Sequence, residues 1–334
     1  MRYVEVGGAR MSAIGLGTWQ FGSREWGYGA DYAEKTAREI TLRALDLGIN
    51  VIDTAEIYGT GRSERAIGAA LDGSDRRSEA FLATKLFPLA PVAVVLEQRA
   101  RASAKRLRTN VIDLYQVHWP NPIVGDGTTM TGMRRVVDNG LVRFAGVSNY
   151  PLSRWRRAEE LFSGPILSNQ VRFSLVDRRP MDELLPFAQS EGRVIIAYSP
   201  LAQGLLGGRY DASNRPSGMT RRMNPVFLPE NLERAEPLID ALRGIASSHQ
   251  AKPAQVALAW LIRKPNVVAI PGASSVEQLE SNAAAAELEL TDAEDAQLLE
   301  AAQRYEPVGG VERARGLAES LVGSVRERLG LGGG

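Results

Sequence analysis

The sequence predicts an α/β protein built as a closed (β/α)8 barrel of the TIM type, with an N-terminal β-hairpin and extra C-terminal helices. Eight short apolar segments recur along the 334 residues, and a stretch with helical periodicity follows each of them. Parallel strands need such helical crossovers. The competing open sheet that binds a dinucleotide should carry a G-x-G-x-x-G fingerprint, and Gln20 and Tyr32 stand where its third glycine belongs.

The predicted elements follow one another in a regular order. A hairpin is expected over residues 2–13, with Gly7 and Gly8 in its turn. The eight strands are expected at residues 13–19, 50–55, 80–85, 112–118, 142–148, 166–172, 194–198 and 266–271. Helices are expected at residues 34–47, 63–71, 91–107, 129–139, 152–162, 181–191, from about 229, and 275–286. Ser63 and Thr291 are predicted N-caps, the latter for an additional helix over residues 292–305.

We expect a single barrel domain over residues 1–334. Two segments fall outside its repeat. A long loop at about residues 201–230 is typical of a lid or a binding loop. A C-terminal extension covers about residues 306–334, and an amphipathic pattern occupies residues 316–329 within it.

Composition excludes several classes of function. Forty basic and 39 acidic side chains leave a formal charge of +1, which provides no electrostatic case for nucleic acid or a membrane surface. The chain has no cysteine, so disulfides, thiolate catalysis and Cys-bound zinc are excluded, and two histidines argue against an all-His metal site. We therefore expect no metal. The N-terminal residues lack the apolar core of a signal peptide, so we expect a cytoplasmic protein, either a monomer or a small homo-oligomer.

Four polar residues stand at or just after the ends of three consecutive predicted strands. Asp53 and Tyr58 follow the second strand, Lys85 ends the third and His118 ends the fourth. Each alone has a structural interpretation, such as a turn cap, a surface lysine or a buried histidine. Their joint placement favours a site, because the carboxyl ends of barrel strands carry the chemistry and because Lys and Asp are rarely buried unpaired.

These four side chains suit proton transfer to a carbonyl oxygen. The pKa of a free tyrosine is about 10, and a nearby ammonium is expected to lower it. Asp53 would then position Lys85, and His118 would orient the substrate carbonyl. None of the four can carry a hydride, so a reduction would need a cofactor.

The chain at this point resembles the aldo-keto reductase family over nearly its whole length. The matching motifs are residues 15–19 (GLGTW), 53–59 (DTAEIYG), 83–85 (ATK), 113–118 (DLYQVH), 146–149 (GVSN), 168–170 (SNQ), 198–204 (YSPLAQG) and 270–275 (IPGASS). The resemblance implies NAD(P)H-dependent reduction of an aldehyde or ketone to an alcohol. It also implies that Tyr58 is the proton donor, with Asp53, Lys85 and His118 in support.

The resemblance further implies the binding residues. The nicotinamide end would contact Gly17, Thr18, Trp19, Asp53, Ser148, Asn149, Gln170 and, by ring stacking, Tyr198. The pyrophosphate would contact Ser199, Pro200, Leu201, Gln203 and Gly204, with charge from Arg209 and Arg222. The adenosine end would contact Ile270, Gly272, Ala273, Ser274, Gln278, Glu280 and Asn282. The substrate would contact Trp19, Tyr58, His118, Trp119 and Asn121.

The adenosine segment departs from many family members, since residues 272–282 contain no Lys or Arg. A phosphate could still bind at the helix N-terminus beside Ser274. The GASS sequence resembles members that use NADPH, including the potassium-channel β-subunit branch. We therefore expect NADPH, with NADH possible.

Two other functions stay open. One is a regulatory subunit similar to the channel β-subunits, which would bind the cofactor and turn over little. The other is a barrel with different chemistry, such as a metal-dependent hydrolase, which would need clustered His and carboxylate ligands. The substrate itself depends on loop geometry that the sequence does not provide.

Overall fold

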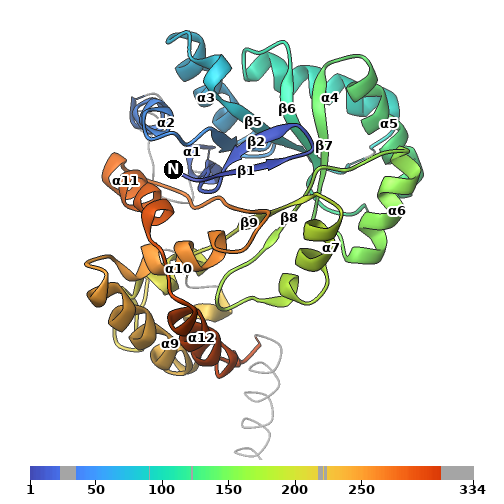
Figure 1. The fold of residues 1–334 in the computed structure, drawn as a ribbon. Helices are drawn as coiled ribbons and strands as arrows, with labels where there is room; N and C mark the ends of the chain where they lie inside the picture. Colours follow the sequence, from blue (N-terminus) through green and yellow to red (C-terminus); the bar gives the residue numbers. More distant parts are fainter. Residues whose placement is uncertain (23–34, 90, 122, 217–220, 222–223, 310–334) are drawn as a thin grey trace, which may run out of the picture.

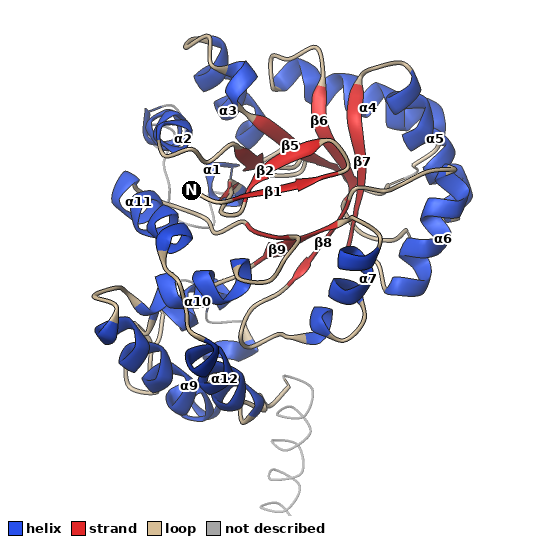
Figure 2. Ribbon diagram, in the orientation of Figure 1, coloured by secondary structure: helices blue, strands red, loops and turns tan. Residues whose placement is uncertain are grey.

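The computed structural model describes residues 1–22, 35–89, 91–121, 123–216, 221 and 224–309. Its centre is a sheet of eight parallel strands in the order β10-β9-β8-β7-β6-β5-β4-β3 (Figures 1 and 2). The strands are β3 (Leu16–Gly17), β4 (Val51–Asp53), β5 (Phe81–Leu86), β6 (Ile112–Val117), β7 (Val142–Ser148), β8 (Ser168–Arg172), β9 (Val194–Tyr198) and β10 (Val267–Ala269).

The first and last strands meet and close the barrel. The amide of Gly15 donates to the carbonyl of Ala269 at 2.8 Å, and the amide of Gly17 donates to the carbonyl of Pro271 at 3.0 Å. A Cβ at position 17 would lie only 2.7 Å from the carbonyl oxygen of Ile270, so this approach requires glycine. The predicted (β/α)8 barrel is confirmed, although its first regular strand is shorter than residues 13–19.

The predicted hairpin is also present, as β1 (Tyr3–Val6) and β2 (Ala9–Ser12). Gly7 and Gly8 have φ angles of 57° and 79°, as its tight turn requires. Met11 of this hairpin packs with Val51 and Phe81, which lie at the amino-terminal ends of their strands. The hairpin therefore covers the end of the barrel opposite to the predicted site (Figure 1).

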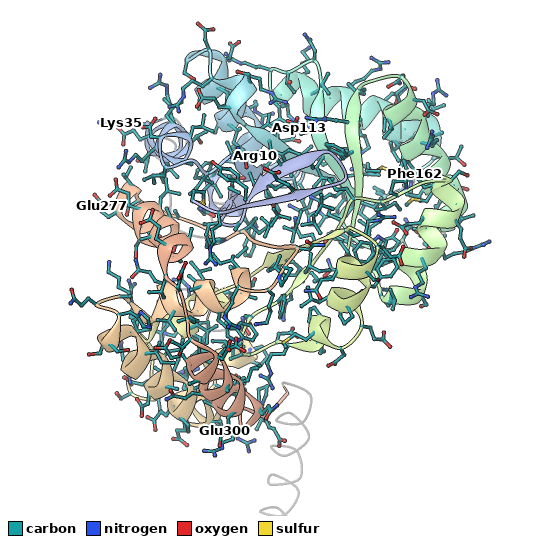
Figure 3. The ribbon with its side chains drawn as sticks, viewed as in Figure 1. Arg10, Lys35, Asp113, Phe162, Glu277 and Glu300 are labelled. Atoms are coloured by element: carbon teal, nitrogen blue, oxygen red, sulfur yellow. The ribbon has the colours of Figure 1, made fainter. Side chains whose placement is uncertain are left out.

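Helices surround the sheet (Figure 2). They are α1 (Trp19–Gly22), α2 (Ala37–Asp46), α3 (Arg62–Asp72), α4 (Ala93–Arg106), α5 (Asp126–Asp138), α6 (Leu152–Phe162), α7 (Leu184–Ser190), α9 (Pro229–Ser248), α10 (Pro253–Ile262), α11 (Val276–Ala284) and α12 (Asp292–Gln303). Short 3-10 turns occur at Arg77–Glu79, Arg179–Met181, Ala202–Gly207, Pro225–Phe227 and Ala285–Glu287. Figure 3 shows the charged side chains Lys35, Glu277 and Glu300 pointing outward from the helical layer.

Several helix boundaries differ from the prediction. Ser63 is not an N-cap, because α3 begins one residue earlier, after Gly61, and the Ser63 hydroxyl is buried against Thr18. The helix expected over residues 181–191 begins only at Leu184, which places Pro186 in its first turn, where a missing N–H is tolerated. The Thr291 cap is confirmed, with a reciprocal bond from Glu294.

The region after β9 contains more helix than expected. Helix α9 begins at Pro229 as predicted, but α10 was not recognised as a separate helix. Its residues from Val256 to Ile262 are all buried, so it lacks the one-sided apolar pattern that reveals a surface helix. The amphipathic pattern at residues 316–329 lies outside the described residues. In the part of the chain that is described, no helix is long and apolar enough to cross a membrane.

The inside of the barrel is apolar in its middle and polar at its carboxyl end. Val51, Ala83 and Leu114 belong to a buried apolar cluster inside the sheet. Because side chains two positions apart share a strand face, the next inward residues of those strands are Asp53, Lys85 and Gln116. Gln170 of β8 and Tyr198 of β9 join them at the same end. The fold thus places a polar layer at the carboxyl end of the barrel, above an apolar interior.

Candidate active site

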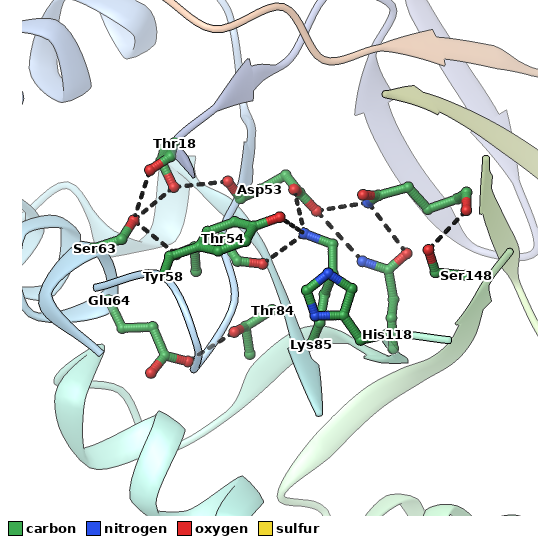
Figure 4. Close-up of polar contacts among 12 residues, drawn as sticks. Thr18, Asp53, Thr54, Tyr58, Ser63, Glu64, Thr84, Lys85, His118 and Ser148 are labelled. Atoms are coloured by element: carbon green, nitrogen blue, oxygen red, sulfur yellow. Dashed lines mark hydrogen bonds and ion pairs between the residues drawn. The ribbon is translucent and has the colours of Figure 1, made fainter. Parts of the chain in front are cut away.

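The centre of the polar layer is an ion pair between Lys85 and Asp53 (Figure 4). Lys85 is fully buried and Asp53 is 2% exposed, and Lys85 Nζ lies 2.5 Å from Asp53 Oδ1. The ammonium also donates to the carbonyl oxygen of Thr54 at 2.8 Å. Burial opposes the charged form of Lys85, but Asp53 and Tyr58 outweigh it and raise the pKa, so the ammonium is retained.

Tyr58 lies on the loop after β4, and its hydroxyl is 3.2 Å from Lys85 Nζ. Gly59, with φ 57°, packs directly on Gly22, where a Cβ would overlap the carbonyl oxygen of Gly22. This close backbone contact holds the loop that carries the phenol.

The sequence analysis expects a lowered pKa for Tyr58, and the structure shows that this expectation is wrong. Burial raises the pKa of Tyr58, and the opposing effect of Lys85 is smaller. The tyrosine is therefore held as a neutral phenol beside an ammonium. That state is the one a proton donor needs.

His118 follows β6, and its amide donates to the carbonyl of Leu86 at 3.0 Å. Its ring meets that of Tyr58 edge-on, with centroids 5.9 Å apart. Burial and then the charge of Lys85 lower its pKa to about 3. The imidazole is therefore neutral at physiological pH, so it can act by hydrogen bonding but not as a cation.

Two amide side chains hold the other oxygen of Asp53. Gln170 Nε2 donates to Asp53 Oδ2 at 2.8 Å, and Gln116 Nε2 donates to the same atom at 3.4 Å. Gln116 was not predicted as a site residue. Its signal was the alternation of Leu114, Gln116 and His118 along one strand, since period two places all three on the same face.

Three buried hydroxyls, of Thr18, Thr54 and Ser63, lie next to the Tyr58 loop (Figure 4). Thr18 Oγ1 donates to the carbonyl of Asp53 at 2.8 Å and lies 2.8 Å from Ser63 Oγ. Thr54 Oγ1 donates to Ser63 Oγ at 2.8 Å, and Ser63 Oγ donates to the carbonyl of Thr18 at 3.0 Å. Ser63 therefore links the segments that follow β3 and β4. The Thr18 hydroxyl is already hydrogen-bonded to other residues of the chain.

The residues expected at the nicotinamide are brought together. Ser148 Oγ donates to the carbonyl of Gln170 at 2.8 Å, and Asn149 Nδ2 donates to Ser148 Oγ at 3.0 Å. The Tyr198 hydroxyl donates to Asn149 Oδ1 at 3.0 Å. Trp19 lies at the start of α1 and is 40% exposed.

The loop after β9 has the backbone shape of an anion cradle. Ser199, Ala202, Gln203 and Gly204 all have left-handed φ angles, at 51°, 47°, 58° and 104°. Left-handed residues next to right-handed ones can turn backbone N–H groups into one concavity, and such strain in non-glycine residues occurs at functional sites. Here the amides of Ala202 and Gly204 bond to carbonyls of the loop itself, at 2.9 Å each. Gln203 Oε1 is also buried without a hydrogen-bond partner in the described chain. These residues fit a dinucleotide pyrophosphate. Pro200 and Leu201 lie within the same loop.

The predicted adenosine residues surround the start of α11. Ser275 caps this helix, and Gln278 Oε1 accepts from both the amide and the hydroxyl of Ser274. Asn282 Nδ2 donates to the carbonyl of Gly272 at 3.2 Å. Ile270 and Ala273 are buried.

A cation that the sequence analysis missed lies at this end. Arg43 of α2 forms an ion pair with Glu280, Nη2 to Oε1 at 2.7 Å. No local pattern could show this pairing, because 237 residues separate the two partners. Arg209 follows the cradle loop, its side chain without an ion pair among the described residues, and Arg222 lies outside them.

The predicted substrate side is partly aromatic. Trp119 packs against His118 at 4.6 Å and against Phe87 at 4.9 Å between centroids. The Asn121 side chain ties two loops together: Nδ2 donates to the carbonyl of Pro88 in the loop after β5, and Oδ1 accepts from the amides of Ile123 and Val124 in its own loop. Its contact with the substrate stays a prediction. Among the described residues, no three His, Asp or Glu side chains gather as metal ligands.

Comparison with known proteins decides the family. Residues 13–303 match the model of the Aldo/keto reductase family. The chain belongs to this family. An uncharacterized oxidoreductase of Mycobacterium tuberculosis is 56% identical over 309 residues, which cover 92% of this chain and 95% of that protein.

Two further aldo-keto reductase comparisons extend this result. The methylglyoxal reductase of Escherichia coli is 32% identical over 294 residues, covering 87% of this chain and 91% of that protein. A crystal structure of an aldo-keto reductase from Klebsiella pneumoniae in complex with NADPH has a TM-score of 0.72 and 30% identity, covering 92% of this chain and 96% of that one. The family resemblance is confirmed, and the chain is an NAD(P)H-dependent oxidoreductase.

Proposed function

We propose that this aldo-keto reductase uses NADPH to reduce an aldehyde or ketone to an alcohol, with Tyr58 as the proton donor. The observation that carries the proposal is the buried chain of contacts from Asp53 through Lys85 to the Tyr58 hydroxyl, at 2.5 and 3.2 Å. A fully buried ammonium beside a neutral phenol suits proton donation to a developing alkoxide.

The protein groups have distinct tasks in this reaction. When bound, the reduced nicotinamide supplies a hydride to the carbonyl carbon. Tyr58 donates its hydroxyl proton to the carbonyl oxygen, and Lys85 stabilises the phenolate that remains. Asp53 holds Lys85 in place and balances its charge. His118, neutral because of its low pKa, orients the carbonyl by hydrogen bonding.

The cofactor site is proposed from the residues that fit it. Ser148, Asn149 and Gln170 offer hydroxyl and amide groups to a carboxamide, and Tyr198 offers a ring for stacking. The left-handed loop from Ser199 to Gly204 suits a pyrophosphate. The NADPH complex of the Klebsiella pneumoniae relative supports the choice of NADPH.

The function is tested by following NADPH oxidation with simple aldehydes in wild type and Tyr58→Phe. We expect steady turnover in wild type and a loss of about 10²- to 10⁴-fold in kcat for the variant, with unchanged NADPH binding. Tyr115→Phe is the matched control, because the buried Tyr115 hydroxyl has no hydrogen-bond partner in the described chain. Retained turnover in Tyr58→Phe would exclude Tyr58 as the donor.

The same experiment addresses the regulatory alternative. NADPH binding in wild type without turnover of any carbonyl probe would favour a cofactor-binding subunit. The cytoplasmic location and the oligomeric state stay predictions.

A further inference from the structure

A cavity of about 640 Å³ lies between the loops that follow β8 and β9 and the end of α12. This volume is in the range of small-molecule sites. The Ser199–Gln203 part of the cradle loop forms one side of it, and residues 172–182 form another. The Ser199–Gln203 side is assigned above to the pyrophosphate, whereas the side formed by residues 172–182 has no role assigned above.

Arg172 connects the cavity to the polar layer. It is the last residue of β8 and pairs in register with Tyr198, while Gln170 pairs with Ile196. Arg172 therefore shares a strand face with Gln170, about 7 Å further toward the carboxyl end. Since Gln170 reaches Asp53 at 2.8 Å, Arg172 stands one layer above the catalytic groups.

Tyr198 lies between the two regions. The guanidinium carbon of Arg172 is 6.0 Å from the centre of the Tyr198 ring. On the other side, the Tyr198 hydroxyl bonds to Asn149, whose amide reaches the carbonyl of His118. A substrate held at His118 would reach Arg172 around the edge of Tyr198, since the ring face is assigned to the nicotinamide.

The cavity holds guanidinium charge that carboxylates do not neutralise. The Arg172 side chain has no hydrogen bond or ion pair to any described residue and is exposed at the cavity. Arg178 is half-buried, and its side-chain bond goes to the carbonyl of Leu175. Arg179 pairs with Asp177 at 2.6 Å, and the charges of Asp177 and Asp182 also act on Arg178, so Arg172 is the guanidinium of this set that lacks a carboxylate partner in the described chain. With Asp182, the cavity contains three arginines and two aspartates, a net charge of +1.

We infer that Arg172, backed by Arg178, binds a carboxylate on the carbonyl substrate, so that the enzyme prefers oxo-acids and aldehyde-acids over neutral carbonyl compounds. The inference rests on the proposed function. A guanidinium fork matches a carboxylate in a bidentate manner, and an unpaired one at a cavity wall is available for such a partner. The reacting carbonyl would lie at Tyr58 and the carboxylate at the cavity.

The test compares two aldehydes that differ only in charge, 4-carboxybenzaldehyde and its methyl ester. We expect wild type to favour the acid in kcat/KM. Arg172→Met should raise KM for the acid about 10- to 100-fold, the loss of a charge-assisted hydrogen-bond pair, and leave KM for the ester and the NADPH Kd unchanged. Arg157→Met is the control, since it removes the same charge from α6, where Arg157 pairs with Glu160.

The possible outcomes separate the inference from the proposed function. Equal use of acid and ester by wild type, or an equal effect of Arg172→Met on both, would overturn the carboxylate site and leave the carbonyl reductase intact. A weaker NADPH Kd in Arg172→Met would assign Arg172 to the cofactor and also overturn it. Turnover of neither aldehyde would count against the proposed function.

Discussion

The ammonium of Lys85 lies 3.2 Å from the hydroxyl of Tyr58, with Lys85 fully buried and Tyr58 partly buried. Burial raises the pKa of the phenol while Lys85 pulls it down. The pair thus keeps the proton on Tyr58 before reaction and stabilises the phenolate after transfer. Three predictions concern this centre and its support.

Replacing Lys85 with Met should lower kcat by about 10²- to 10⁴-fold, because the phenolate left by proton donation loses its cation. Removal of the lowering effect of Lys85 should also raise the pKa of Tyr58 further, so the alkaline limit of the residual activity should move to higher pH. The measurement is the pH profile of kcat/KM. Lys264→Met is the control, since Lys264 is a partly buried lysine stacked on Trp260, 3.6 Å from the ring centre. An alkaline limit that moves to lower pH would contradict the prediction.

His118 should make the stability of the fold depend on acid pH. Its folded-state pKa is about 3, whereas an unfolded chain gives about 6.5, so between these values only the unfolded chain binds the proton. Above about pH 6.5 the protonation of His118 does not reduce the free energy of unfolding. As the pH falls below that value, the free energy of unfolding decreases by about 1.4 kcal/mol per pH unit. The difference in free energy of unfolding between wild type and His118→Gln, from urea titrations, should shrink accordingly. If the difference in free energy of unfolding between wild type and His118→Gln stays constant from neutral to acid pH, this prediction is contradicted.

Ser63→Ala should destabilise the protein by about 1–3 kcal/mol, because the buried hydroxyls of Thr18 and Thr54 both lose their shared partner. Since Thr54 also supplies a carbonyl to Lys85, kcat should fall as well. The control is Ser248→Ala, an exposed serine that bonds only within its own helix. Thermal unfolding and kcat measure the two effects. If Ser63→Ala changes stability and kcat no more than Ser248→Ala does, the supporting role of the Ser63 hydroxyl is contradicted.

The strand-end residues could be predicted because their cause is local. Asp53, Lys85 and His118 lie at or next to the last residues of β4, β5 and β6, and a parallel barrel brings these strand ends to one side. The same local logic failed at Ser63, where the pattern of a helix cap concealed a bond to Thr18, 45 residues earlier. It also missed Gln116, whose alternation with Leu114 and His118 gives the strand face, whereas its partner Asp53 lies 63 residues away in the sequence.

The sequence by itself determined the alternation of strands and helices, the family and the identity of the four central side chains. These depend on periodicity and on motifs within short windows. Only the tertiary structure decided the sign of the Tyr58 pKa shift, the pairing of Arg43 with Glu280 and the isolation of Arg172 above Gln170. The reason is that burial and charge pairing depend on which distant segments meet, and the closure of the barrel settles those contacts.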